Sequence, residues 1–285
     1  MNPAMALGLL LVLGTAVLGW AAVRNASRWR APAALVAGGR RGRVVLETSV
    51  EQLGRVVTAV LVVLAGSGFA IAGLWALGWP IKLTERAFDV PVFEWFQAQR
   101  DTSPSWWRRL WLILTNIGGL NQTQALTVVF AVGLAVLWRR QRWWVPLTVL
   151  PVGYVLEKTL QDLLKLVVNR GHPPTSLGSF PSGGNARVIL VYGLIVFLVL
   201  RWRRTTDRRV WVAGAAVVAL CAAVQAYART FNLEHWVTDV GAGLLLGAML
   251  LATMAAAVWV LDRDPTPSAP RPLLPHRRGD GRVTG

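Results

Sequence analysis

Two residues at the start of the last apolar run, His235 and Asp239, have the types and the spacing of a catalytic pair. They are four residues apart, so a helix would place both side chains on one face. The carboxylate can accept the N–H of the imidazole, fix its tautomer and raise the basicity of the other ring nitrogen. A histidine held in this way is a nucleophile or a general base. The same pair is structural in most proteins, so the prediction depends on its neighbours.

Basic residues accompany the pair. Arg229 comes six residues before His235. Lys165 ends the fourth apolar run, and Arg170 and His172 follow it. In the topology derived below all of them fall on one membrane face. This concentration favours a functional site.

The fourth apolar run also carries charge inside the membrane. Lys158, Asp162 and Lys165 share one helical face at i, i+4 and i+7. Ionisable groups at membrane depth are costly and usually face the bundle interior. A Lys158–Asp162 pair that only stabilises the bundle is an equally good interpretation.

A third polar segment, Pro181-Ser182-Gly183-Gly184, opens another apolar run. Serine is a good helix N-cap, and backbone N–H groups at a helix start can hold an anion where glycine allows close approach. An ordinary capping turn has the same sequence features.

The composition indicates a membrane protein. Of the 285 residues, 54% are hydrophobic and 15% are charged, and the mean hydropathy is +0.46, which is typical of polytopic membrane proteins. The net charge of +16 comes from arginine clusters between apolar runs, a pattern of membrane topology and not of nucleic-acid binding. Cys221 is the only cysteine, so no internal disulfide can form. The sequence shows no Cys/His zinc pattern and predicts no metal or other cofactor.

The apolar runs predict seven membrane spans, roughly 4–23, 56–78, 121–138, 143–165, 186–202, 210–227 and 237–260. Arginine clusters follow the first span, separate the third from the fourth and the fifth from the sixth, and follow the last. Seven spans put all four clusters on one side, which the positive-inside rule makes cytoplasmic. We expect a plasma-membrane protein with its N-terminus outside and its C-terminus in the cytoplasm. The connections 79–120, 166–185 and 228–236 then face outward.

Together these residues resemble the type 2 phosphatidic acid phosphatase superfamily of integral membrane lipid phosphatases. Its signature is Lys, six residues, then Arg-Pro; Pro-Ser-Gly-His; and Ser-Arg, five residues, His, three residues, Asp. The corresponding residues here keep the order and spacing, and are Lys165 and His172-Pro173, then Pro181-Ser182-Gly183-Gly184, then Ala228-Arg229, His235 and Asp239.

The resemblance implies a role for each matching residue. His235 would attack phosphorus and form a phosphohistidine, and Asp239 would orient it. Lys165 and Arg229 would hold the phosphoryl oxygens, where electrostatic stabilisation is largest. Ser182, Gly183 and Arg170, which lies five residues after Lys165, would also bind the phosphate. The family needs no metal.

Several positions depart from the family pattern. Gly184 replaces the histidine that protonates the leaving oxygen, His172 replaces an arginine, Ala228 replaces a serine, and Leu233 lies where a glycine is common. General acid catalysis contributes about 10²–10⁴-fold. When a lipid diphosphate is cleaved, the leaving group is a lipid monophosphate, which is a stable anion because its second pKa is about 6. Such a leaving group depends less on protonation than the alcohol that leaves from a lipid monophosphate.

The expected function is therefore dephosphorylation of a lipid phosphate at the extracytoplasmic side, with a polyprenyl diphosphate preferred. A linked hypothesis gives His172 the lost proton-donating role. The alternatives are an impaired member that binds or translocates lipid phosphates, and a phosphatidyl or phosphoryl transferase. We expect the bilayer and a lipid phosphate as partners, and no nucleic acid; the sequence names no protein partner.

The resemblance also suggests the domain organisation. Residues 1–23 would be an N-terminal transmembrane anchor, 24–52 a basic cytoplasmic loop, 53–261 the six-helix phosphatase-like core, and 262–285 a disordered cytoplasmic tail. The first span lacks Lys or Arg before it, which favours an uncleaved anchor over a signal peptide.

Overall fold

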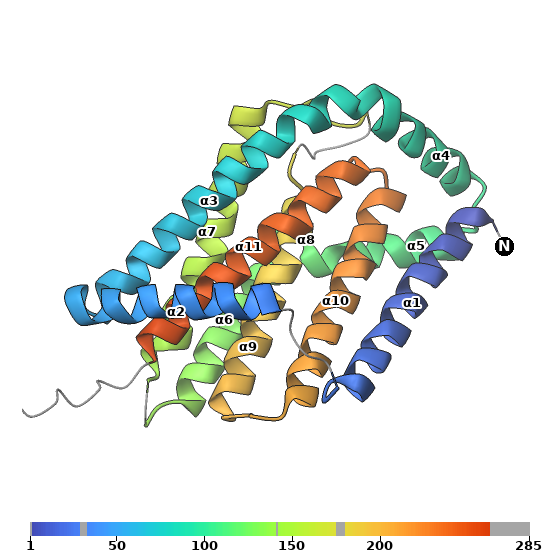
Figure 1. Ribbon diagram of the computed structural model, residues 1–285. Helices are drawn as coiled ribbons and strands as arrows, with labels where there is room; N and C mark the ends of the chain where they lie inside the picture. The colour runs from blue at the N-terminus through green and yellow to red at the C-terminus, as the bar shows by residue number, and fades with distance from the viewer. Residues whose placement is uncertain (1, 29–32, 141, 175–179, 263–285) are drawn as a thin grey trace, which may run out of the picture.

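The computed structural model describes residues 2–28, 33–140, 142–174 and 180–262. Within these ranges the chain is helical, with short turns and no β-strand (Figure 1). This confirms the predicted all-α class. The predicted tail, 262–285, lies outside the described residues apart from Asp262.

The bundle consists of long helices with apolar sequences. They are α1 (Pro3–Asn25), α3 (Arg55–Thr84), α6 (Leu120–Leu137), α7 (Trp144–Val168), α10 (Arg208–Phe231) and α11 (Val237–Leu261). A further span joins three consecutive segments, α8 (Gly183–Arg187), the π-helical η3 (Val188–Tyr192) and α9 (Gly193–Trp202). Each predicted span thus falls within helical structure, and α1 is additional to six others.

Six helical stretches among the described residues are long and apolar enough to cross a membrane. The chain is therefore a multi-pass membrane protein. The remaining predicted span corresponds to α7, which has 25 residues. This helix is long enough to cross a membrane, but its second half is less apolar than the six stretches. That half carries Glu157, Lys158, Asp162 and Lys165.

The predicted loop over 24–52 is wrong in one respect, since it contains the helix α2 (Ala33–Leu53). Arg43 and Glu47 form an i,i+4 ion pair of 2.9 Å on its surface. Leu46 and Val50, also four apart, pack against a small apolar cluster of α3 and α11. These two contacts explain why a basic segment is helical here.

The long connection after α3 is also helical. It contains the π-helical η1 (Glu85–Asp89), α4 (Val90–Asp101), α5 (Ser105–Leu114) and the 3₁₀ turn η2 (Thr115–Gly118). In α5, Trp107 and Trp111 are buried while Trp106 and Leu112 are exposed, so the helix is amphipathic. The buried tryptophans join an aromatic cluster with Phe93, Phe96, Tyr227, Phe231 and Trp236.

The two ends of the bundle differ in composition. Helices α3 and α7 end, and α8 and α11 begin, near the turn that carries His235, whereas the connections rich in arginine lie at the other end (Figure 1). This segregation agrees with the topology expected from the sequence. The side of the membrane on which each end lies stays a prediction.

Two glycines of α11 allow the helix to lie directly against α8. A Cβ at Gly243 would overlap the carbonyl oxygen of Ser182, and one at Gly247 would lie 2.5 Å from the carbonyl oxygen of Ala186. The contact places the first turn of α11 beside the Pro181–Gly184 turn, where Ser182 N donates to the Asp239 carbonyl over 2.9 Å.

Replacing Gly243 by alanine should separate these two elements. We expect Gly243→Ala to lower the stability by about 1–3 kcal/mol, as overpacking in a core does, and to lower any activity. Gly241→Ala is the matched control, since nothing lies within 4 Å of that position. Thermal unfolding in detergent measures both. Equal midpoints for the two variants would contradict the close approach.

Candidate active site

His235 lies in the turn between α10 and α11, at the entrance to the first turn of α11. Its Nδ1 lies 3.8 Å from Oδ2 of Asp239, which is longer than a hydrogen bond. Neither atom has a hydrogen-bond partner among the described residues, and both side chains are buried. The structure thus brings the predicted pair together, with its two free polar atoms facing each other.

A single buried arginine holds the other oxygen of Asp239. Arg170 Nη1 donates to Asp239 Oδ1 over 2.7 Å, Nη2 donates to Asp89 Oδ2 over 2.5 Å, and Nε donates to Glu85 Oε2 over 2.9 Å. The guanidinium is fully buried. Burial alone would lower the pKa of Arg170, but Asp239, Glu85 and Asp89 raise it, so it stays charged. The sequence suggested a phosphate contact for Arg170, whereas its donors are occupied by carboxylates.

Asp89 also caps the start of α11. Its Oδ1 accepts from Thr238 N over 3.1 Å, and its Oδ2 accepts from the Thr238 hydroxyl over 2.7 Å. A carboxylate at a helix N-terminus is favourable, because it satisfies free N–H groups and the helix dipole. Sequence reasoning missed Glu85 and Asp89. Their four-residue spacing directly after an apolar run was the available signal.

Arg229 reaches the same region from the last turn of α10. One of its nitrogens forms an ion pair with Glu234, and its Nε is buried without a partner among the described residues. Glu234 Oε1 accepts in turn from the Thr115 hydroxyl of η2 over 3.3 Å. The acidic neighbour of His235 therefore holds the guanidinium next to the imidazole.

A second buried arginine, Arg187, lies beneath the Pro181–Gly184 turn. Its Nη1 is 3.4 Å from Glu157 Oε2 and donates to Gln161 Oε1 over 3.1 Å. Gln161 packs against Gly183 so closely that a Cβ there would overlap the amide. The structure thus pairs Glu157 with Arg187, and gives no Lys158–Asp162 ion pair among the described residues.

The other predicted residues lie around this centre. Lys165 is half-buried and within electrostatic range of Arg187, Arg229 and Glu157. Ser182 is fully buried at the N-cap position of α8, where its hydroxyl accepts from the Asn185 amide over 2.9 Å and not from the backbone. His172 is exposed, and its Nδ1 lies 2.9 Å from the Pro173 carbonyl. Neither His235 nor Asp239 forms a hydrogen bond with His172.

Residues 125–263 match the family model of the PAP2 superfamily, and this range contains all three motifs. This segment of the chain therefore belongs to the PAP2 superfamily. The fold is also that of a solved structure, the first transmembrane PAP2 type phosphatidylglycerolphosphate phosphatase from Bacillus subtilis. The two share a TM-score of 0.57 and 19% identity, over 68% of this chain and 98% of that chain. Comparison with curated proteins gave no match.

At Gly184, where the PAP2 pattern has a histidine, side chains of α10 occupy the space that a side chain would take. A Cβ on Gly184 would lie 2.9 Å from Nη2 of Arg229 and 2.9 Å from Nε2 of Gln225. Gln225 is fully buried; its Oε1 accepts from Gly118 N over 3.2 Å, while its Nε2 has no partner among the described residues. Sequence reasoning missed Gln225, although it lies one turn before Arg229 on the same helical face.

Leu233 explains why glycine is common at its position in PAP2 proteins. Its φ is 61°, in the left-handed region that is costly for a side chain with a Cβ. Leu233 is buried in the aromatic cluster with Trp236. Its packing offsets part of the backbone cost of the turn that carries His235.

Removing the Arg170 guanidinium should leave three carboxylates without their cation. We expect Arg170→Gln to lower the unfolding free energy by about 3–5 kcal/mol, the cost of breaking a buried ion pair on one side. Arg86→Gln is the matched control, because Arg86 is exposed on the same π-helical turn as Glu85. Thermal unfolding of both variants is the measurement, and similar midpoints would refute the central role of Arg170.

The protonation of His235 should respond to its burial. Burial lowers the pKa of the imidazole, and the Asp239 carboxylate offsets part of this effect. The pKa therefore lies below the ordinary value of about 6.5, so the ring stays neutral and nucleophilic to lower pH. Because the folded state binds this proton less well than the unfolded state, the protein loses stability as the pH falls through 6.5. Histidine NMR titration, assigned with His235→Ala, would disagree if it gave a pKa above 6.5.

Proposed function

We propose that this chain is an integral membrane phosphatase that removes phosphate from a lipid phosphate through a phosphohistidine at His235. The observation that carries the proposal is the buried His235–Asp239 pair, which Arg170 fixes at the end of the bundle where Lys165 and Arg229 also lie. A protein that only binds phosphate has less need of a histidine with a buried carboxylate behind it.

In the first step His235 Nε2 attacks phosphorus, so that an N–P bond forms as the bond from phosphorus to the leaving oxygen breaks. Asp239 lies on the Nδ1 side and stabilises the positive charge that the ring gains. Water then attacks phosphorus, the N–P bond breaks, and inorganic phosphate leaves. The chemistry needs no metal ion.

The positive groups around His235 suit the charge of a phosphoryl group in transfer. Lys165 and Arg229 would hold its oxygens, and the buried donor Gln225 Nε2 would add a neutral hydrogen bond. Glu234 would release Arg229 when phosphate enters, because two anions compete for one guanidinium. Ser182 and Gly183 would approach from the start of α8.

The leaving group follows from Gly184. Without the family's histidine, the site lacks a buried acid at that position, and the exposed ring of His172 is the remaining imidazole near it. A diphosphate lipid, which leaves as a monophosphate anion, loses less from the missing proton than a phosphatidic acid does. We therefore propose a polyprenyl or similar lipid diphosphate as the preferred substrate.

Arginine placement supports the plasma membrane, with the site on the extracytoplasmic side. The connections rich in arginine lie at the end of the bundle opposite to His235, and such connections remain in the cytoplasm.

A catalytically impaired lipid-phosphate binder or translocator is the second candidate. The observations that favour it are Gly184 at the acid position and the distance of 3.8 Å between His235 and Asp239. Such a protein would keep the affinity for lipid phosphate without releasing phosphate.

A phosphate-release assay with the purified full chain tests the proposal across lipid monophosphates and diphosphates. We expect release to be faster from the diphosphates, and His235→Ala to reduce it to background. An acid-labile phosphohistidine should be trapped in the parent protein and be absent from His235→Ala. Lipid-phosphate binding without release or phosphohistidine would instead identify the impaired binder.

The same assay separates the two ideas about the leaving group. Faster release from phosphatidic acid than from a polyprenyl diphosphate would contradict the substrate preference. His172→Ala tests the proton donor, since an unchanged rate would exclude His172 from that role.

A further inference from the structure

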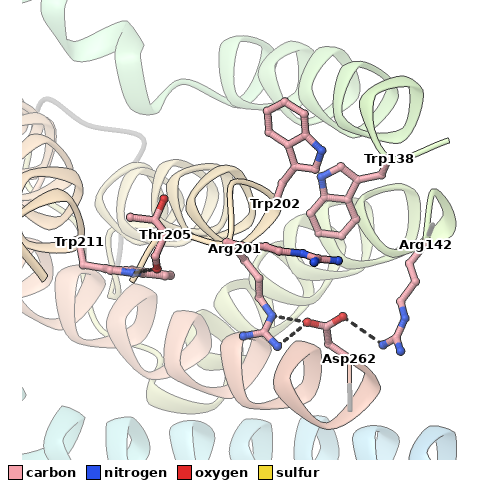
Figure 2. Close-up of a pocket in the computed structure, with 8 residues that line it drawn as sticks. Trp138, Arg142, Arg201, Trp202, Thr205, Trp211 and Asp262 are labelled. Atoms are coloured by element: carbon pink, nitrogen blue, oxygen red, sulfur yellow. Dashed lines mark hydrogen bonds and ion pairs between the residues drawn. The ribbon is translucent and has the colours of Figure 1, made fainter. Parts of the chain in front are cut away.

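A cavity of about 710 Å³ lies at the end of the bundle opposite to His235. It lies where α6, α9 and α11 end and where α7 and α10 begin. Figure 2 shows its lining side chains, which are Trp138, Arg142, Arg201, Trp202, Arg204, Thr205, Trp211 and Asp262. We call this cavity the arginine pocket.

Asp262 organises two of the three arginines. Its Oδ1 accepts from Arg142 Nη1 over 3.1 Å, and its Oδ2 accepts from Arg201 Nε over 2.6 Å, as the dashed lines of Figure 2 mark. Arg142 also donates to the Leu261 carbonyl over 2.6 Å. One carboxylate thus fixes two guanidinium groups that come from different helix ends.

The third arginine has a different environment. Arg204 lies in the turn between α9 and α10 with a φ of 50°, and Trp211 Nε1 donates to the adjacent Thr205 carbonyl over 2.9 Å. This hydrogen bond holds the backbone of the turn in place. No described residue forms a hydrogen bond or an ion pair with the Arg204 side chain. Three guanidinium groups face one carboxylate, so the pocket has a net positive charge.

We propose that the arginine pocket binds the phosphate of an anionic phospholipid headgroup, in the leaflet opposite to the candidate active site. A planar guanidinium matches phosphate oxygens in a bidentate geometry, and no described residue occupies the side-chain donors of Arg204. Asp262 holds Arg142 and Arg201 in place beside it. The volume lies within the range of small-ligand sites.

The position of the pocket decides between a lipid and a soluble anion. Trp138, Trp202 and Trp211 line it, and tryptophan is enriched at the level of the lipid headgroups. Basic pockets between helix ends on the cytoplasmic side are a known way to hold anionic headgroups. The phosphate of a lipid whose chains lie along the bundle reaches this depth without leaving the bilayer.

The proposal is independent of phosphatase activity, and its test uses a different readout. Thermal unfolding of the full chain is followed in zwitterionic detergent with short-chain phosphatidylglycerol, short-chain phosphatidylcholine or inorganic phosphate at equal ionic strength. We expect phosphatidylglycerol to raise the midpoint and phosphatidylcholine to leave it unchanged. Any rise with inorganic phosphate, which can bind the candidate active site, should be the same in Arg204→Gln. His235→Ala should show the same rise, so a failed phosphatase assay leaves this result standing.

Two arginine variants separate the pocket from general surface charge. Arg204→Gln removes a guanidinium that pairs with no described residue, and should weaken phosphatidylglycerol binding roughly tenfold. Arg203→Gln removes the same charge from the neighbouring exposed residue, which does not line the pocket, and should leave binding nearly unchanged.

Equal weakening by the two variants would overturn the proposal in favour of nonspecific surface attraction. An equal rise with inorganic phosphate, lost in Arg204→Gln, would overturn the lipid as its source and identify a soluble anion. If phosphatidylcholine raised the unfolding midpoint as much as phosphatidylglycerol does, the pocket would not select an anionic headgroup, and the proposal would be wrong.

Discussion

The contact between Arg170 and its three carboxylates is the constraint on which the rest of the site depends. It joins η1, the segment after α7 and the first turn of α11, three parts of the chain that are far apart in sequence. Taking these charges out of water is costly, and only the full set of hydrogen bonds offsets that cost. The backbone of α11 therefore has one favourable position relative to α7, and the imidazole of His235 is placed by it.

Gly184 lacks the imidazole of the PAP2 pattern, and other side chains lie where that imidazole would be. The space of the absent side chain is lined by nitrogen donors of α10, from Gln225 and Arg229. A histidine cannot simply be restored there, because those side chains would have to move. Hydrogen-bond donors thus occupy the place where the PAP2 pattern has a histidine, and such donors are suited to stabilising negative charge.

The sequence was sufficient to predict the membrane spans and to locate the three motifs, because spans and their spacing depend on local composition. It could not identify Glu85, Asp89, Arg187 or Gln225, since their importance comes from contacts across the bundle. Arg170 shows the same limit: its type suggested a phosphate ligand, and only the position of η1 reveals that carboxylates occupy it. The helix in 33–53 was missed because its stability comes from packing on α3 and α11.

The N-terminal helix has a consequence beyond attachment to a membrane. Gly8 of α1 lies against the ring of Tyr227, and the Tyr227 hydroxyl donates to the Ala4 carbonyl over 2.6 Å. Tyr227 belongs to the aromatic cluster that holds Leu233, and thereby the turn of His235. Because α1 is covalently tethered, its high effective concentration keeps it docked on the aromatic cluster that supports the turn of His235. The packing of the N-terminal helix and the position of His235 are therefore linked.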